Sequence, residues 1–172
     1  MPSDEGWGRD RRPVIHVSWM DAKSYVAWLS RMTGNTYRLL TEAEWEYAAR
    51  ADSETRFSFG DNEMQLEEYA WYGSNSDRKT HPVGMKDANA FGLQDMLGNV
   101  YEWVEDPWHD TYEGAPTDGS EWAKDGDKSR RVVRGGSWGN TVRRVRSAFR
   151  MFDSPEVREN DRGFRVARTL SP

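Results

Sequence analysis

The stretch Gly92–Trp103, GLQDMLGNVYEW, decides how the rest of the chain is interpreted. It combines two glycines, two carboxylates and two aromatic residues and shows neither a helical nor a strand period, so we expect a loop with a special backbone conformation. A bound hard cation would hold such a loop through the carboxylates of Asp95 and Glu102 and nearby carbonyl oxygens. An ordinary set of turn hydrogen bonds would also hold it. The residues alone leave both alternatives open.

The composition indicates one loop-rich domain over residues 1–172. Only 36% of the residues are apolar, yet nine are Trp, seven are Tyr and six are Phe. The core must therefore rest on large aromatic side chains rather than on aliphatic runs. Charged residues reach 31%, but the tryptophans are spread along the whole chain, which argues against disorder.

The chain contains no cysteine. Disulfides, thiolate metal sites and cysteine nucleophiles are therefore excluded. No apolar stretch approaches the length of a membrane span, and the first residues lack the basic and apolar pattern of a signal peptide. We expect a cytoplasmic protein without a membrane partner.

The charge is unevenly distributed along the chain. Residues 129–172 carry eleven Arg, no Lys and four acidic residues, which gives +7 and leaves −12 for residues 1–128. We expect most of these arginines to form structural ion pairs with the acidic remainder, because the guanidinium group suits bidentate pairing and aromatic stacking. A nucleic-acid surface is the alternative, and the acidic overall charge and the absence of a nucleic-acid motif disfavour it.

Two helices are predicted from capping boxes and apolar spacing. Ser18-x-x-Asp21 opens the first helix, whose apolar residues recur every three or four positions until Gly34 ends it. Thr41-x-x-Glu44 opens a second, shorter and alanine-rich helix that runs to about Ala51.

Short strands and long loops are predicted for most of the remaining chain. Residues 52–91 have the Gly, Pro and Asn content of loops, and residues 112–127 are rich in Gly, Asp and Pro. The predicted strands are Val14–Val17, Tyr37–Leu40, Arg131–Arg134, Val145–Arg150 and Gly163–Ala167.

Four ordered stretches carry a family resemblance. They are residues 13–19 (PVIHVSW), residues 38–50 (RLLTEAEWEYAAR), residues 89–103 (NAFGLQDMLGNVYEW), and residues 133–138 (VRGGSW) together with Gly163-Phe164-Arg165. Together they resemble the formylglycine-generating-enzyme (sulfatase-modifying factor) domain, a variant of the C-type lectin fold. The resemblance implies an α+β fold with two helices, a twisted antiparallel sheet and long irregular loops. It also implies a further N-terminal segment before Pro13, so we expect the chain to be a fragment or a shortened form.

The resemblance implies one structural calcium ion. The family's calcium site falls on the side chains of Asp95 and Glu102 and on the carbonyl groups of Gly98 and Val100. A second family site, near residues 70–71, finds no matching carboxamide here, so we expect one calcium ion rather than two.

The resemblance also implies a copper-dependent oxidation of a substrate cysteine to formylglycine, but that chemistry needs two cysteines. The corresponding positions are Asn140 and Val145, which cannot supply the thiolates that Cu(I) selects. We expect no copper and no catalytic residues, and we interpret Ser137 as part of a structural Gly-Gly-Ser turn. The three histidines, His16, His81 and His109, lack a ligand-pair spacing, so an iron site is not expected either.

The remaining prediction is ligand binding. Residues 131–168 are similar to the variable proteins of diversity-generating retroelements, which belong to the same fold and display a binding surface near the C-terminus. We expect a protein or other macromolecular ligand, and the alternative is a divergent or inactive formylglycine-generating oxidoreductase. The predicted ligand-binding residues are Trp138, Gly139, Asn140, Thr141, Arg143, Arg144, Phe149, Met151, Phe152, Asp153, Val157, Glu159, Asn160 and Asp161. For Phe149 and Phe152, core packing is an equal alternative.

Overall fold

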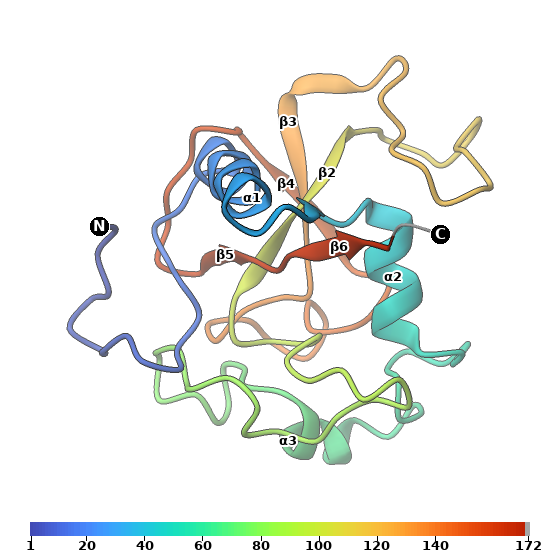
Figure 1. Ribbon diagram of the computed structural model, residues 1–172. Helices are drawn as coiled ribbons and strands as arrows, with labels where there is room; N and C mark the ends of the chain where they lie inside the picture. The colour runs from blue at the N-terminus through green and yellow to red at the C-terminus, as the bar shows by residue number, and fades with distance from the viewer. Residues whose placement is uncertain (171–172) are drawn as a thin grey trace.

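The computed structural model describes residues 1–170, an α+β arrangement of short strands, two main helices and long loops (Figure 1). The helices are α1 (Trp19–Thr33), α2 (Glu42–Arg50) and α3 (Leu66–Tyr69), the last preceded by a 3₁₀ turn at Glu63–Gln65. The strands are β1 (Thr36–Arg38), β2 (Tyr101–Trp108), β3 (Asp127–Arg134), β4 (Arg150–Asp153), β5 (Arg162–Phe164) and β6 (Ala167–Thr169).

Helix α1 begins and ends where the sequence predicts. Ser18 accepts a hydrogen bond from the Asp21 amide while Asp21 accepts one from the Ser18 amide, so both halves of the capping box are formed. Gly34 adopts the left-handed conformation that ends the helix, with φ of 69°. The helix buries Trp19, Ala22 and Val26 against the sheet.

Helix α2 is also confirmed. Thr41 and Glu44 form its capping box, and Ala51 ends the helix with φ of 49°, a conformation usually left to glycine. The buried face of α2 carries Trp45 and Ala49.

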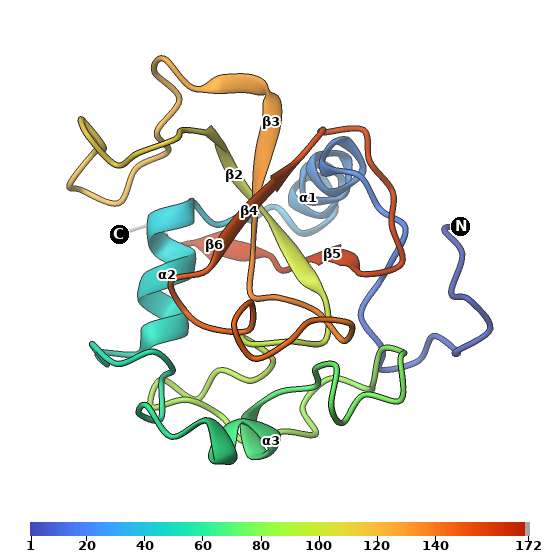
Figure 2. The same ribbon diagram turned by 180° about the vertical axis from the view of Figure 1, so that it is seen from behind.

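The main sheet has the strand order β4-β3-β2-β5, and β1 pairs with β6 in a separate two-stranded sheet. The β2–β3 and β3–β4 pairs are antiparallel, as predicted, but β2 and β5 run parallel, so the sheet is mixed. The strands cross steeply, and α1 and α2 lie to either side of the crossing (Figures 1 and 2).

Two predicted strands do not form. Residues 14–17 are irregular, with His16 at φ of 56°, and the Val17 carbonyl accepts a hydrogen bond from the Trp103 indole instead of a strand partner. Residues 145–149 form turns because Val145 is drawn into the core, and β4 starts only at Arg150. The predicted strand Gly163–Ala167 is split between β5 and β6.

The core is built on aromatic residues, as the composition predicts. Trp45, Trp103, Tyr101 and Phe57 are at most 1% exposed. The indole of Trp103 donates to the Val17 carbonyl at 2.9 Å, and the indole of Trp19 donates to the Val104 carbonyl at 2.8 Å. These two indole rings therefore fill the core and also fix a neighbouring segment.

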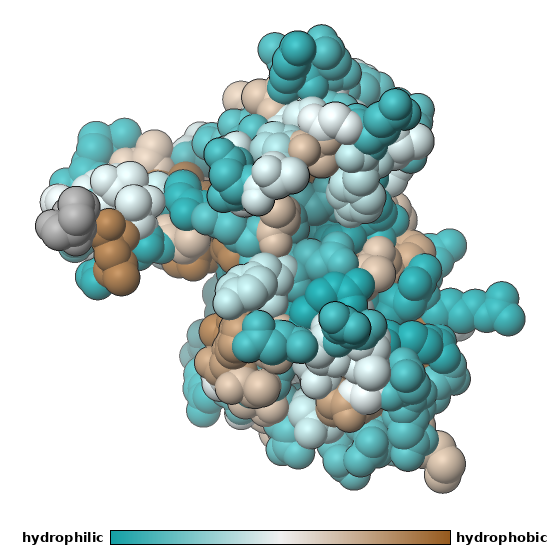
Figure 3. Space-filling model, turned by 90° about the vertical axis from the view of Figure 1, so that its right-hand side faces the viewer, coloured by the Kyte–Doolittle hydropathy of each residue, from teal (hydrophilic) through white to brown (hydrophobic). Residues whose placement is uncertain are grey.

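The face of the molecule seen in Figure 3 is mostly hydrophilic, with apolar residues in small groups. Residues 109–126 project from the ends of β2 and β3, as expected for a loop (Figure 1). Among residues 1–170 no helix has the length and apolar character needed to cross a membrane.

Candidate functional site

The loop before β2 is bonded to two segments that lie far from it in the sequence. The Gly98 amide donates to the Gly135 carbonyl at 2.9 Å, and the Asn99 amide donates to the Trp71 carbonyl at 2.8 Å. Gly98 has φ of 74°, and a Cβ atom there would lie 2.2 Å from the Trp71 carbonyl oxygen. Only glycine suits this position, because it needs a left-handed backbone and contact with another main chain.

The carboxylate of Glu102, 6% exposed, is the centre of an ion pair beside this loop. The Arg165 guanidinium donates to both of its oxygens, from Nε at 2.6 Å and from Nη2 at 2.7 Å. The Trp45 indole donates to the same group at 2.7 Å. Arg165 Nη2 also donates to the Asp95 carbonyl at 3.0 Å, so one guanidinium connects both ends of the predicted calcium loop.

Asp95 and Glu102 face one cavity of about 240 Å³, which Val100 also lines. Burial raises the pKa of Asp95, and the neighbouring Glu102 charge acts in the same direction, while the Gly84 amide and Arg165 oppose the shift. Two carboxylates face one guanidinium, so a hard cation would relieve the remaining negative charge. Three of the four predicted ligands are thus brought together, whereas Gly98 does not line the cavity.

The fit to calcium is partial. Both Glu102 oxygens already accept hydrogen bonds, which leaves the free Asp95 oxygen, carbonyl groups and water as the main ligands. No group of three or more His, Asp or Glu side chains suited to a metal occurs within residues 1–170. The calcium site stays a prediction.

The positions of the family's catalytic thiols hold residues with structural contacts. The Asn140 side chain accepts a hydrogen bond from the Ser137 amide at 2.9 Å, and its carbonyl accepts one from the Gly73 amide at 2.8 Å. Val145 is 0% exposed and belongs to the apolar cluster around Phe57. Asn140 therefore closes a turn, and Val145 fills the core.

Ser137 is also buried in a polar network. Its hydroxyl donates to the Asp161 carboxylate at 3.3 Å, and Arg162 pairs with Asp161 at 2.5 Å and with Asp153 at 3.1 Å. Among the described residues no histidine contacts this serine through a hydrogen bond, so a Ser–His pair is not formed here.

The three histidines lie in separate surroundings. His16 contacts Glu5 at 2.6 Å, His81 stacks on Trp71, and His109 stacks on Trp122. Each histidine ring thus has its own contacts, and the three rings do not form one site.

The predicted ligand surface is only partly exposed. Phe149 and Met151 pack against the main core cluster, so core packing describes these two residues. The half-buried members are Trp138, Asn140, Phe149, Met151, Asp153, Val157, Asn160 and Asp161. The exposed members are Gly139, Thr141, Arg143, Arg144, Phe152 and Glu159.

The exposed residues lie toward two ends of β3. The Phe152 ring packs on Trp108, which pairs with Asp127 at the start of β3, whereas residues 139–144 follow the end of that strand and contact the loop that begins at Trp71. The predicted surface is therefore not one continuous patch of side chains.

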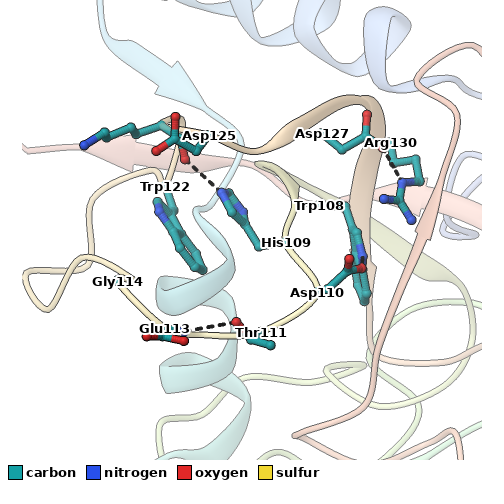
Figure 4. Close-up of a pocket in the computed structure, with 11 residues that line it drawn as sticks. Trp108, His109, Asp110, Thr111, Glu113, Gly114, Trp122, Asp125, Asp127 and Arg130 are labelled. Carbon is teal, nitrogen blue, oxygen red and sulfur yellow. Dashed lines mark hydrogen bonds and ion pairs between the residues drawn. The ribbon is translucent and has the colours of Figure 1, made fainter.

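A cavity that the sequence analysis missed lies near Phe152. Its volume is about 400 Å³, and Trp108, His109, Trp122 and Arg130 are among the residues that line it (Figure 4). His109 and Trp122 stack with ring centroids 3.6 Å apart, and Phe152 packs on Trp108 at 4.8 Å. The aromatic residues of the projecting loop were visible in the sequence, but nothing there indicated that they would form a cavity with the start of β3.

The basic C-terminal part divides into paired and unpaired arginines. Seven of its eleven arginines form ion pairs, which confirms the structural interpretation for most of them; these are Arg130, Arg131, Arg134, Arg150, Arg158, Arg162 and Arg165. The deepest pairing surrounds Glu42, which Arg150 contacts at 2.8 and 2.6 Å and Arg134 at 3.4 Å.

Comparison with protein families gives a match over residues 2–170 to the model of the sulfatase-modifying factor enzyme 1-like domain. The formylglycine-generating enzyme of Mus musculus is 35% identical over 177 residues, which covers 92% of this chain and 45% of the mouse protein. The chain spans about half the length of the curated relatives that it matches.

Two solved structures extend the comparison to the fold. PvdO from Pseudomonas aeruginosa is 44% identical with a TM-score of 0.88, over 94% of this chain and 64% of that chain. Treponema denticola variable protein 1 is 31% identical with a TM-score of 0.81, over 96% of this chain and 74% of that chain. The fold predicted from the sequence is confirmed.

Proposed function

The chain belongs to the sulfatase-modifying factor enzyme 1-like family, and from that premise we propose that it is a non-catalytic, ligand-binding member. Its ligand is a protein segment bound mainly at the loop of residues 138–144, with residues 149–161 as the flanking part of the surface. One calcium ion at Asp95 and Glu102 would have a structural role in this proposal.

The observation that carries the proposal is the environment of the two thiol positions. Asn140 closes the turn after Ser137, and Val145 is wholly buried among apolar side chains. Soft thiolate ligands for Cu(I) are absent from the chain, and neither position is left open for another metal ligand.

The loop of residues 138–144 has the features of a displayed binding surface. Trp138 anchors it, since its indole donates to the Asn160 carbonyl at 3.2 Å and its carbonyl accepts from the Ser76 hydroxyl at 2.7 Å. Beyond this anchor Gly139 and Thr141 are exposed. A fixed base below exposed residues lowers the conformational entropy lost on binding.

The similarity to Treponema denticola variable protein 1 supports a display role, because it extends over 96% of this chain. It also motivates the further proposal that residues 131–168 are a variable region. A reverse transcriptase gene with a near-copy of the codons for these residues nearby would support that proposal, and its absence would tell against it.

A divergent formylglycine-generating activity is the second candidate. It is favoured by the identity to formylglycine-generating enzymes, 35% for the mouse protein. That candidate requires ligands other than thiolates at the copper site.

Panning a displayed random-peptide library on the purified protein tests the binding proposal. Peptides enriched on the protein should lose binding to Thr141→Trp, which blocks the exposed loop, and should keep binding to the matched control Thr117→Trp, another exposed threonine. Failure to enrich any peptide sensitive to Thr141→Trp would overturn the proposal.

A further inference from the structure

Three unpaired arginines lie on one loop. Arg143, Arg144 and Arg146 form no ion pair with the described residues, in contrast to seven of the other C-terminal arginines. Arg143 and Arg144 are exposed, and both belong to the loop proposed to bind the ligand. This loop therefore carries positive charge that no ion pair within the described residues neutralises.

The backbone of this loop presents the charges in a defined arrangement. The Arg144 amide donates to the Thr141 carbonyl at 2.9 Å, and the Val145 amide donates to the Val142 carbonyl at 3.2 Å. The Arg146 Nε group donates to the Arg143 carbonyl at 3.2 Å, so one arginine stabilises the turn that carries the other two. Buried Val145 fixes the end of the turn in the core.

A buried hydroxyl lies below the same loop. Tyr101 is 1% exposed, and its hydroxyl has no hydrogen-bond partner among the described residues. Burial raises the pKa of Tyr101, and the neighbouring Arg144 and Arg162 guanidinium groups oppose the shift. The Arg144 guanidinium is therefore close to the Tyr101 hydroxyl, which places this exposed arginine over the core.

We propose that Arg143 and Arg144 recognise carboxylate side chains, so that the ligand is an acidic peptide segment of a protein. This inference rests on the proposed ligand-binding function of the same loop. The guanidinium fork matches a carboxylate in bidentate geometry, and neither arginine needs to break an existing ion pair to bind.

A nucleic acid fits this loop less well. Residues 1–128 carry a net charge of −12, and the total is −5. A phosphate backbone that extends beyond the basic loop would therefore be repelled by the acidic remainder of the protein. Non-specific nucleic-acid binding needs several phosphate contacts along the strand. A short acidic segment needs only the loop itself.

The test is fluorescence anisotropy with a labelled Asp/Glu-rich peptide, a Gln/Asn-rich peptide of equal length and a single-stranded oligonucleotide of equal charge. The full chain is compared with Arg143→Gln/Arg144→Gln. The matched control is Lys128→Gln/Arg168→Gln, which removes the same charge from two exposed positions that also form no ion pair in the described residues. Circular dichroism melting checks that both variants fold.

The acidic peptide should bind the wild type, and Arg143→Gln/Arg144→Gln should weaken it about tenfold or more, as expected for the loss of two charge-assisted contacts. The control should change affinity less than about twofold. Absence of acidic-peptide binding, equal weakening in the control, or tighter binding of the oligonucleotide would each overturn the inference. Neutral library peptides that are sensitive to Thr141→Trp but not to Arg143→Gln/Arg144→Gln would leave the ligand-binding function intact and overturn only the acidic specificity.

Discussion

Replacing Glu42 by Gln should strongly destabilise the protein. Glu42 is 6% exposed and accepts two hydrogen bonds from Arg150, at 2.8 and 2.6 Å, while Arg134 lies 3.4 Å away and is itself 0% exposed. Gln keeps the shape but loses the charge, and its amide group meets guanidinium N–H donors. Arg134 keeps its contacts with Glu46 and the Ser147 carbonyl, so we expect the low end of the range for a broken buried pair, about 3 kcal/mol.

Urea unfolding followed by circular dichroism measures the loss in the free energy of unfolding. In a thermal melt, the same loss should lower the melting temperature by about 6 to 12 °C. The matched control is Glu63→Gln, since the Glu63 side chain is 48% exposed and its partner Arg56 is 42% exposed. That exposed pair should contribute less than about 1 kcal/mol. Adding Arg150→Met to Glu42→Gln should recover part of the stability, because the uncompensated charge is removed. Equal small losses for Glu42→Gln and Glu63→Gln would refute the assignment of Glu42 as a buried ionic centre.

Three further predictions concern stability. Gly98→Ala should lower the free energy of unfolding by several kcal/mol more than Gly92→Ala does. Both glycines have positive φ, but only at Gly98 would the Cβ atom meet another main chain. Equal losses of stability in urea unfolding would contradict the close approach to Trp71. Calcium should raise the melting temperature of chelator-treated protein, and Glu102→Gln should remove the increase; an unchanged melting point with chelator would tell against the site. Burial raises the pKa of Asp106, whose carboxylate accepts hydrogen bonds from the Glu42 and Trp122 amides. The contribution of Asp106 to the free energy of unfolding is therefore complete below about pH 4 and declines as the pH rises through the raised pKa. The stability lost in Asp106→Asn should shrink as the pH rises, and a loss that grows with pH would contradict this sign.

The sequence predicted the elements whose signals are local. The capping boxes at Ser18 and Thr41 use side chains three residues apart, so both helices and their ends were readable from the chain. The aromatic core was also predictable, because no other residue class could supply the apolar volume.

The errors came from contacts between distant residues. Residues 145–149 resemble a strand, but Val145 is buried in the cluster around Phe57, which lies far away in the sequence. The parallel pairing of β2 with β5 likewise depends on how the chain returns after β4. Local propensity does not encode either feature.

The candidate site was predictable in part. The sequence placed Asp95, Val100 and Glu102 together because they lie within eight residues of one another, although Glu102 belongs to β2 rather than to the loop before it. It did not indicate that Arg165 would pair with Glu102. It predicted that most C-terminal arginines would be paired, but only the ion pairs themselves separate Arg143, Arg144, Arg146 and Arg168 from the other seven. The cavity beside Trp108 forms between the start of β3 and the projecting loop, whose folded path the sequence does not show.

The central claim, that this family member binds without catalysing the family's oxidation, is tested most directly by mass spectrometry. The purified protein is incubated with copper, oxygen and a sulfatase-motif peptide that contains a cysteine, with a formylglycine-generating enzyme in parallel as the positive control. The peptide mass should remain unchanged in the presence of this protein, because Asn140 and Val145 supply no thiolate. Conversion of the peptide cysteine to formylglycine above the copper-only background would contradict the account.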